Sequence, residues 1–224
     1  MLNNVFKRID NLLKHKDFVV VAIDGKCVKP VGILSQSDSK GGESMISLLE
    51  EYTGNTIYPL HRLDREVGGV MVYAKNKFAA SVLSRDIAEN RFKKEYVAVV
   101  HSKPLEPEGV LQDLLFKDSS KNKSYVVKKE RKGVKKASLE YITLESNEEL
   151  SAVKILLHTG RTHQIRVQFA SRKMPLAGDK KYGAKDEFSN MGLMSYRLTF
   201  KHPKTHKKMI FVNDYKDFIS GFIK

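Results

Sequence analysis

The sequence of 224 residues contains a single cysteine, Cys27, and no apolar run long enough to span a membrane. One cysteine excludes an internal disulfide framework and any zinc site built from several cysteines. The opening Leu2-Asn3-Asn4 does not begin a signal peptide. Together these features predict a soluble protein of a reducing compartment, the cytoplasm, without a membrane partner.

Glycine patterns that bind phosphates or dinucleotides are missing as well, because the pair Gly41-Gly42 lacks the required neighbours. Zinc is a poor interpretation of His158 and His163, which are five residues apart with no obvious third ligand. Internal repeats and low-complexity tracts are not found either. The sequence therefore predicts no metal and no nucleotide cofactor.

Acidic residues are few beside basic ones, at 26 against 40, and the formal net charge is +14. Residues 1–112 carry a net charge of only +2, whereas residues 113–224 carry +12. Between positions 117 and 136 nine basic residues accompany two acidic ones. This excess favours a polyanionic partner such as nucleic acid, through phosphate neutralisation and counterion release. A solvated basic hairpin that binds nothing is the alternative.

Hydrophobic periodicity predicts both helices and strands. Helices are expected over 2–14, 45–52, 76–87 and 162–172, with Asn76 as a cap. Strands are expected over 18–23, 70–74, 95–100, 138–144, 152–157, 193–200 and 209–212. Because strands outnumber helices without regular alternation, the prediction is an α+β fold with a mixed, mostly antiparallel central sheet and flanking helices. The length fits one domain, residues 1–224, or two small lobes sharing one sheet.

Asp64 stands between Arg62 and Arg65 in a polar segment, residues 59–69, that precedes an apolar strand. Nearby cations favour the ionised form of a carboxylate, so Asp64 is expected to stay charged. An ionised carboxylate can act as a nucleophile or a base. A salt bridge to the neighbouring arginines is the alternative, and local composition alone favours it.

Two further segments carry candidate residues. Tyr96 follows the basic stretch Arg91–Lys94, and it could stack on a base or transfer a proton, although a lone strand tyrosine more often packs on a sheet face. In the segment His158–Arg166 a strand ends in a glycine turn and polar residues open a helix, followed later by Gly178–Gly183. Such a turn presents backbone amides and arginines to an anion.

Together the three segments resemble the RluA family of pseudouridine synthases. The family has a His-Arg-Leu-Asp box, a basic-Lys-x-Tyr box about thirty residues later and a Gly-Arg-Thr-His-Gln-Ile-Arg box. The corresponding segments here are His61–Asp64, Lys93–Tyr96 and Gly160–Arg166, in the same order. The resemblance runs from about Val28 to Val212. One box could arise by chance, but three in register are highly specific.

The resemblance implies a pseudouridine synthase fold and the isomerisation of uridine in structured RNA. This reaction breaks the N1–C1′ bond, rotates the base and rejoins it through C5, with no cofactor. Asp64 matches the essential carboxylate, Arg166 its salt-bridge partner, and Tyr96 the tyrosine that lies against the target base. Whether the carboxylate attacks the sugar, attacks the ring or removes a sugar proton stays open.

For RNA binding, the resemblance implies that Arg62 enters the RNA stack when the target nucleotide is extruded. Arg161 and His163 are candidates for contacts with the RNA backbone. Because extrusion costs least in a loop, the expected substrate is a stem-loop of ribosomal or transfer RNA. The protein is expected to be a monomer. Two alternatives are a non-catalytic RNA-binding or assembly protein on the same fold and a hydrolytic nucleosidase.

The sequence departs from the family pattern at three places. Val67-Gly68 stands where Thr-Ser is usual, and we expect altered packing rather than lost activity. Asp24–Val28 is inserted before Lys29-Pro30-Val31-Gly32, and we expect this insertion to shift the N-terminal strand. Only an expected helix over residues 1–16 precedes Asp17, so the S4-type RNA-binding domain of many relatives is predicted to be missing. The basic hairpin at 117–136 would then have to bind RNA.

Overall fold

A computed structural model describes residues 17–21, 29, 31–37 and 44–224 of the chain. The chain divides into two compact units. Unit 1 comprises Met1–Lys94 and Met194–Tyr215, and unit 2 comprises Glu95–Leu193 and Lys216–Lys224. The helix expected over residues 1–16 and the insertion Asp24–Val28 lie outside the described residues. That the whole chain forms a single catalytic domain stays a prediction.

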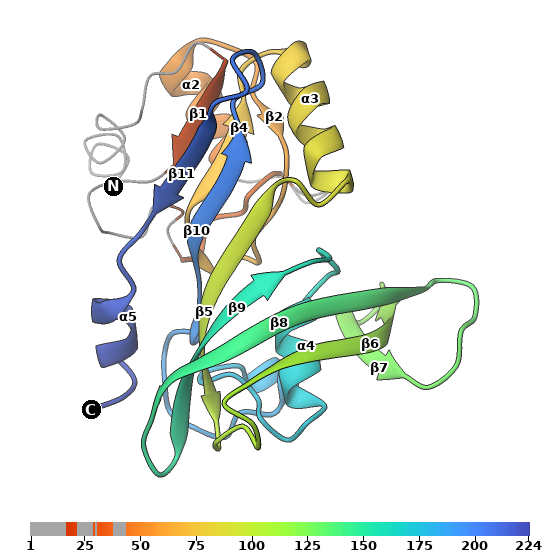
Figure 1. Ribbon diagram of the computed structural model, residues 1–224, viewed down its shortest axis with the longest axis vertical. Helices are drawn as coiled ribbons and strands as arrows, with labels where there is room; N and C mark the ends of the chain where they lie inside the picture. Colours follow the sequence, from red (N-terminus) through yellow and green to blue (C-terminus); the bar gives the residue numbers. More distant parts are fainter. Residues whose placement is uncertain (1–16, 22–28, 30, 38–43) are drawn as a thin grey trace. The chain divides into compact units, whose positions relative to one another are not determined.

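Unit 1 contains two sets of paired strands (Figure 1). Its elements are β1 (Phe18–Val21), α2 (Met45–Thr53), β2 (Tyr58–Pro59), β3 (Gly68–Gly69), β4 (Met71–Ala74), α3 (Lys77–Ala88), β10 (Leu193–Lys201, nearly all in unit 1) and β11 (Lys208–Val212). The strands β1, β4 and β2 form an antiparallel sheet in that order. Strand β10 pairs antiparallel with β11 and parallel with β3. The strands are thus mixed and mostly antiparallel, as the sequence predicted.

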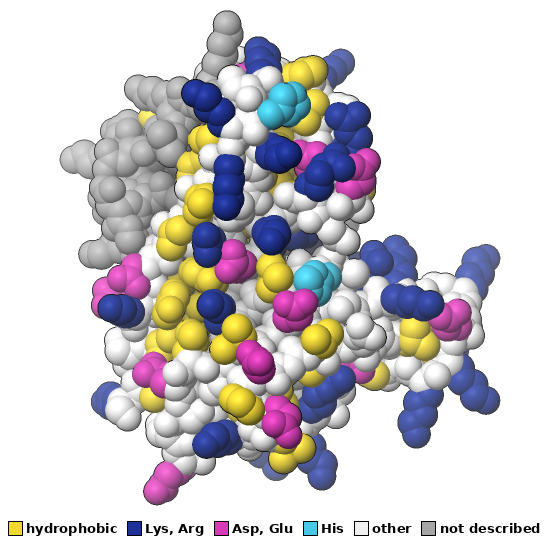
Figure 2. Space-filling view, viewed as in Figure 1, with side chains coloured by type: hydrophobic (Ala, Val, Ile, Leu, Met, Phe, Trp, Pro, Cys, Tyr) yellow, Lys and Arg dark blue, Asp and Glu magenta, His cyan; other side chains and the backbone are white. Residues whose placement is uncertain are grey.

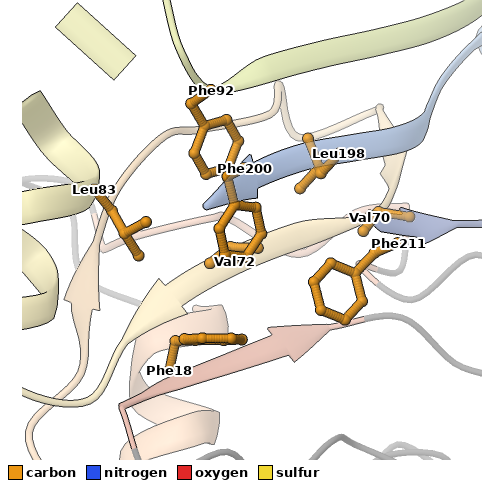
Figure 3. Close-up of a cluster of buried hydrophobic side chains, with 8 residues drawn as sticks. All are labelled: Phe18, Val70, Val72, Leu83, Phe92, Leu198, Phe200 and Phe211. Carbon is orange, nitrogen blue, oxygen red and sulfur yellow. The ribbon is translucent and has the colours of Figure 1, made fainter. Parts of the chain in front are cut away.

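Aromatic side chains form the core of unit 1 (Figure 3). The buried cluster consists of Phe18, Val70, Val72, Leu83, Phe92, Leu198, Phe200 and Phe211. Phe200 stacks on Phe92, with ring centroids 4.9 Å apart, and meets Phe18 edge to face at 5.4 Å. Each such side chain contributes about 1.5–3 kcal/mol by leaving water. This core holds β4, and therefore the segment that precedes it, in a fixed position.

The helices α2 and α3 of unit 1 begin at side-chain caps. Ser44 and Ser47 form a reciprocal capping box at the start of α2. The Asn76 side chain accepts a hydrogen bond from the Ala79 amide at 2.9 Å at the start of α3, which confirms the predicted cap. Helix α2 buries Met45, Leu48 and Leu49 along one face.

Unit 2 is built on a sheet with the strand order β5-β9-β8-β6-β7 (Figure 1). Its elements are β5 (Lys93–His101, nearly all in unit 2), β6 (Glu108–Asp118), β7 (Lys123–Val127), β8 (Val134–Ser146), β9 (Leu150–Leu157), α4 (Gln164–Ala170), a 3-10 turn (Lys180–Tyr182) and α5 (Lys216–Ser220). β6 lies between β7 and β8 and pairs antiparallel with both. Residues 117–136 therefore comprise the end of β6, all of β7 and the start of β8.

Helix α4 covers one face of these strands. Val167 of α4 packs against Leu115 of β6 and Ala137 of β8. The Gln168 side chain donates from Nε2 to the carbonyl of Leu111 at 3.1 Å, which adds a polar anchor to the apolar contact. None of the helices in the described part of the chain is long and apolar enough to cross a membrane.

Candidate active site

Asp64 lies in the loop that connects β2 to β3 in unit 1, and its side chain is half-buried. The preceding Leu63 is buried, and its backbone forms a reciprocal pair with Ser35. The Leu63 amide donates to Ser35 Oγ at 3.0 Å, and that hydroxyl donates to the Leu63 carbonyl at 2.9 Å. The Val67 amide donates to the Asp64 carbonyl at 3.1 Å, which closes a turn. The loop is therefore anchored immediately before and after Asp64.

A buried lysine, Lys29, forms hydrogen bonds with the backbone of this loop. Lys29 is 0% exposed, and its Nζ donates to the carbonyls of Arg65 at 3.1 Å and Val67 at 2.8 Å. A buried ammonium is tolerated only when such acceptors satisfy it. The sequence matched Lys29 to a family motif without assigning it a role. In the structure it fixes the backbone that carries Asp64.

Gly69, in β3 at the end of this loop, packs closely against the backbone of β10. Its φ is +123°, and a Cβ there would lie 2.2 Å from the carbonyl oxygen of Ser195, so only glycine fits. The Val70 amide donates to the same Ser195 carbonyl at 2.8 Å, and Ser195 Oγ donates to the Val70 carbonyl at 3.0 Å. Val67, which departs from the family pattern, is buried in the same unit.

His61 stands three residues before Asp64 and acts as a neutral acceptor. Its Nε2 accepts a hydrogen bond from the Val72 amide of β4 at 3.2 Å. Burial, reinforced by the charge of Lys94, lowers the pKa of His61 to about 3. His61 is therefore uncharged at neutral pH, and it ties the loop to β4 rather than supplying a positive charge.

The two arginines beside Asp64 differ in their settings. Arg65 donates from Nε to the carbonyl of Gly32 at 2.8 Å, and the Gly32 amide donates back to the Arg65 carbonyl at 2.9 Å. Arg62, the residue expected to enter the RNA stack, is exposed. The position of Arg62 is compatible with that role, which stays a prediction.

In unit 2, Arg166 of α4 forms a buried, bidentate ion pair with Asp179. Its Nε donates to Asp179 Oδ2 at 2.7 Å and its Nη2 to Oδ1 at 2.8 Å. The exposed fractions of the two side chains are 4% and 0%. Paired hydrogen bonds between a guanidinium and a carboxylate fix the plane of the arginine as well as its position. Asp179 therefore orients the arginine that the sequence predicts as catalytic.

Tyr182 joins three parts of unit 2. Its hydroxyl lies 2.9 Å from His163 Nδ1 and accepts a hydrogen bond from the Ser124 amide at 2.8 Å. The guanidinium carbon of Arg166 is 5.1 Å from the centre of its ring, within the range of a cation–π contact. Asp179 and Tyr182 lie in the segment Gly178–Gly183, in which the sequence alone assigned no role to either residue.

The predicted RNA-binding residues of unit 2 differ in exposure. His163 is largely buried and has a left-handed φ of 52°. Arg161 is exposed, but its Nε donates to the carbonyl of Lys136 at 3.0 Å, which ties this segment to β8. Gln164 supports the same turn, because its Oε1 accepts from the Arg161 amide at 3.1 Å. The RNA contacts of Arg161 and His163 stay predictions.

Tyr96 lies on β5 and is 5% exposed. Asp64 belongs to unit 1, whereas Tyr96 and Arg166 belong to unit 2. The proposed ion pair between Asp64 and Arg166 therefore stays a prediction.

Over residues 17–21, 29, 31–37 and 44–224, no group of three or more His, Cys, Asp or Glu side chains is placed to hold a metal ion.

Comparison with known proteins identifies the family. The family model described as RNA pseudouridylate synthase matches residues 26–171. The chain belongs to this family. As an RNA pseudouridylate synthase family member of the RluA type, it carries Asp64, Tyr96 and Arg166 inside the matched range.

Individual relatives agree with this membership. An uncharacterized RNA pseudouridine synthase of Aquifex aeolicus is 38% identical over 68% of this chain and 51% of its own length. The ribosomal large subunit pseudouridine synthase D of Borreliella burgdorferi is 31% identical over 88% of this chain and 61% of its own length. The chain thus spans about half to three fifths of the curated relatives it matches.

A solved structure supports the fold. The human RNA pseudouridylate synthase domain containing 4 superposes with a TM-score of 0.76 at 21% identity, over 98% of this chain and 94% of the other. This likeness confirms the pseudouridine synthase fold that the sequence motifs implied.

Proposed function

We propose that the protein is an RNA pseudouridine synthase that isomerises specific uridines in structured RNA. The observation that carries the proposal is the family match over residues 26–171, which contains all three boxes with Asp64, Tyr96 and Arg166 intact. A ribosomal or transfer RNA stem-loop is the proposed substrate, and one relative is named for the large ribosomal subunit. We place the protein in the cytoplasm as a monomer that needs neither a metal nor a cofactor.

In the proposed reaction the Asp64 carboxylate acts on the extruded uridine while its N1–C1′ bond breaks, and the base rejoins through C5. The anchored loop holds this carboxylate in place through Lys29 and Ser35. A guanidinium has five N–H donors. Two of those of Arg166 serve Asp179, and we propose that Arg166 also holds Asp64 ionised and aimed.

Tyr96 completes the proposed site by lying against the target base. A phenol with an ordinary pKa of about 10 is a weak base at neutral pH. It therefore needs a preorganised position to help remove the C5 proton, and a place on a buried strand such as β5 supplies a rigid one. Arg62 fills the space that the extruded nucleotide leaves in the RNA.

The test of this function is a product assay on RNA from the host. Wild-type protein is expected to leave the RNA mass unchanged and to create uridine isomers that react with acrylonitrile, detected by mass spectrometry after cyanoethylation. Release of free uracil would instead identify a nucleosidase. RNA binding without any chemical change would support the alternative of an assembly protein.

The hairpin at 117–136 gives a second prediction, on RNA affinity. Changing Lys128, Lys129 and Lys132 to Gln is expected to weaken RNA binding and to flatten its salt dependence. Each lost phosphate contact lowers the slope of log K against log salt by about 0.7–0.9. The measurement is fluorescence anisotropy over a salt series.

The matched control removes three lysines from unit 1, Lys201, Lys207 and Lys208, which are also exposed. This control changes the net charge equally but leaves the hairpin intact. An equal loss of slope in both variants would show that only the overall charge matters and that the hairpin has no special contact with RNA.

A further inference from the structure

The three strands β6, β7 and β8 have one covered and one open face. Helix α4 covers the face of Leu115 and Ala137. Because side chains alternate along a strand, their immediate neighbours point to the opposite side. The side chains on this open face at the hairpin end are Leu114, Phe116, Asp118, Lys123, Tyr125, Val127, Val134 and Lys136. It is thus a largely apolar face whose charged members are two lysines and Asp118.

Two aromatic residues lie opposite each other on neighbouring strands of the open face. Phe116 and Tyr125 are directly opposite each other in the β6–β7 register, so their side chains are neighbours. Tyr125 is 36% exposed. The guanidinium carbon of Arg131 lies 4.6 Å from the centre of the Phe116 ring. Aromatic rings and arginine guanidinium planes are the groups on which proteins stack unpaired nucleobases.

Lysine and arginine side chains gather on the hairpin, which lies at the right in Figure 2. The basic residues of the hairpin are Lys117, Lys121, Lys123, Lys128, Lys129, Arg131, Lys132, Lys135 and Lys136. Its two acidic side chains are engaged locally. Asp118 Oδ1 accepts three hydrogen bonds from Ser120 and Lys121, and Glu130 lies 3.4 Å from Lys136 Nζ. The field around the rings is therefore strongly positive.

The hairpin is fixed to the segment that carries Arg166. Ser124 Oγ donates to the Thr162 carbonyl at 2.6 Å. Lys123 Nζ donates to the Lys181 carbonyl at 2.6 Å and lies 5.8 Å from the Tyr125 ring and 5.0 Å from the Tyr182 ring. A group bound on Tyr125 would thus be held at a defined distance from Arg166 within unit 2.

We propose that the open face around Phe116 and Tyr125 is a stacking platform for unpaired bases of the RNA substrate. This inference rests on the proposed function for the identity of the polymer and adds a recognition surface to it. Bases of a duplex are stacked on one another, whereas loop bases expose a face that aromatic rings and arginine planes can cover. The surrounding lysines neutralise the phosphates on either side.

The test compares the binding of a short oligouridylate that contains 2-aminopurine with the binding of a duplex RNA. Tyr125→Leu keeps apolar bulk but removes the ring. It is expected to weaken oligouridylate binding at least about fivefold, the effect of losing one stacked base. Phe116→Leu is expected to act in the same direction. The slope against salt should not change, since neither substitution removes a charge.

Two controls accompany these variants. Tyr125→Phe retains the ring and is expected to bind like the wild type. Ile142→Ala removes a side chain that is 44% exposed on the same face of β8 but outside the hairpin end, and it should also have no effect. Thermal unfolding of each variant shows whether the sheet is intact. Because Tyr125 lies at the surface, Tyr125→Leu tests the platform even if Phe116→Leu unfolds.

If Tyr125→Leu bound oligouridylate as tightly as the wild type does, the platform proposal would be overturned and this face would be left to another partner. An equal loss on duplex RNA would also overturn it. Each outcome is separable from the proposed function. A wild-type protein that forms pseudouridine while Tyr125→Leu binds normally refutes only the platform. A wild-type protein without activity, whose oligouridylate binding still depends on Tyr125, refutes only the proposed function.

Discussion

Asp64→Asn is expected to reduce pseudouridine formation by about four orders of magnitude or more, the size of effect seen when the group that performs the chemistry is removed. Asparagine has nearly the same shape but cannot carry the negative charge. The described supports of the loop, from Lys29 to the Arg65 and Val67 carbonyls and from Ser35 to Leu63, do not use the carboxylate. The variant should therefore fold and bind RNA. Nucleotide-resolution mapping of pseudouridine in host RNA measures the loss.

Glu66→Gln is the matched control, because Glu66 is an exposed carboxylate two residues along the same loop. It is expected to retain wild-type activity. If Asp64→Asn retained full activity, the assignment of Asp64 would be wrong. Equal losses in the two variants would point instead to the general charge of the loop.

The sequence predicted those parts of the fold in which a single periodicity repeats without interruption. The run Val70–Ala74 is apolar throughout and forms β4 within one residue of the expected bounds. In α3 the cap at Asn76 and the apolar spacing agree with each other. Both signals are local, so the positions of distant residues were not needed to interpret them.

Strand β6 was missed because both of its faces carry apolar residues. Leu111 and Leu115 face α4, while Leu114 faces the opposite side, and this i, i+3, i+4 spacing is that of a helix rather than a strand. The outward position of Leu114 is relevant to function, because Leu114 lies beside the proposed platform. Similarly, α4 is shorter than predicted at both ends, and His163 in a left-handed conformation excludes an earlier start.

The candidate site was predicted only in part. The three boxes gave the residues, but no local pattern links Arg166 to Asp179, which comes 13 residues later after the end of the helix. Lys29 is likewise 36 and 38 residues away from the carbonyls it holds. Such long-range supports depend on the folded chain. Periodicity and composition do not report them.

Asp179→Asn is expected to lower the free energy of unfolding by about 3–5 kcal/mol, because it removes the negative charge from a buried ion pair. Arg166 and Asp179 are 4% and 0% exposed, so water cannot replace the lost partner. Urea denaturation measures this change. Glu130→Gln is the control. It breaks an ion pair of the same unit whose side chains are 83% and 68% exposed, and the expected change is below about 1 kcal/mol.

A second readout separates support of the fold from positioning of the arginine. At a temperature where circular dichroism shows Asp179→Asn to be folded, single-turnover pseudouridine formation is expected to fall at least about tenfold while RNA affinity is retained. The reason is that a guanidinium no longer held in one plane aims poorly at the reacting carboxylate. Asp179→Glu keeps the charge and should recover part of the rate. An unchanged rate in the folded Asp179→Asn protein would limit Asp179 to a structural role.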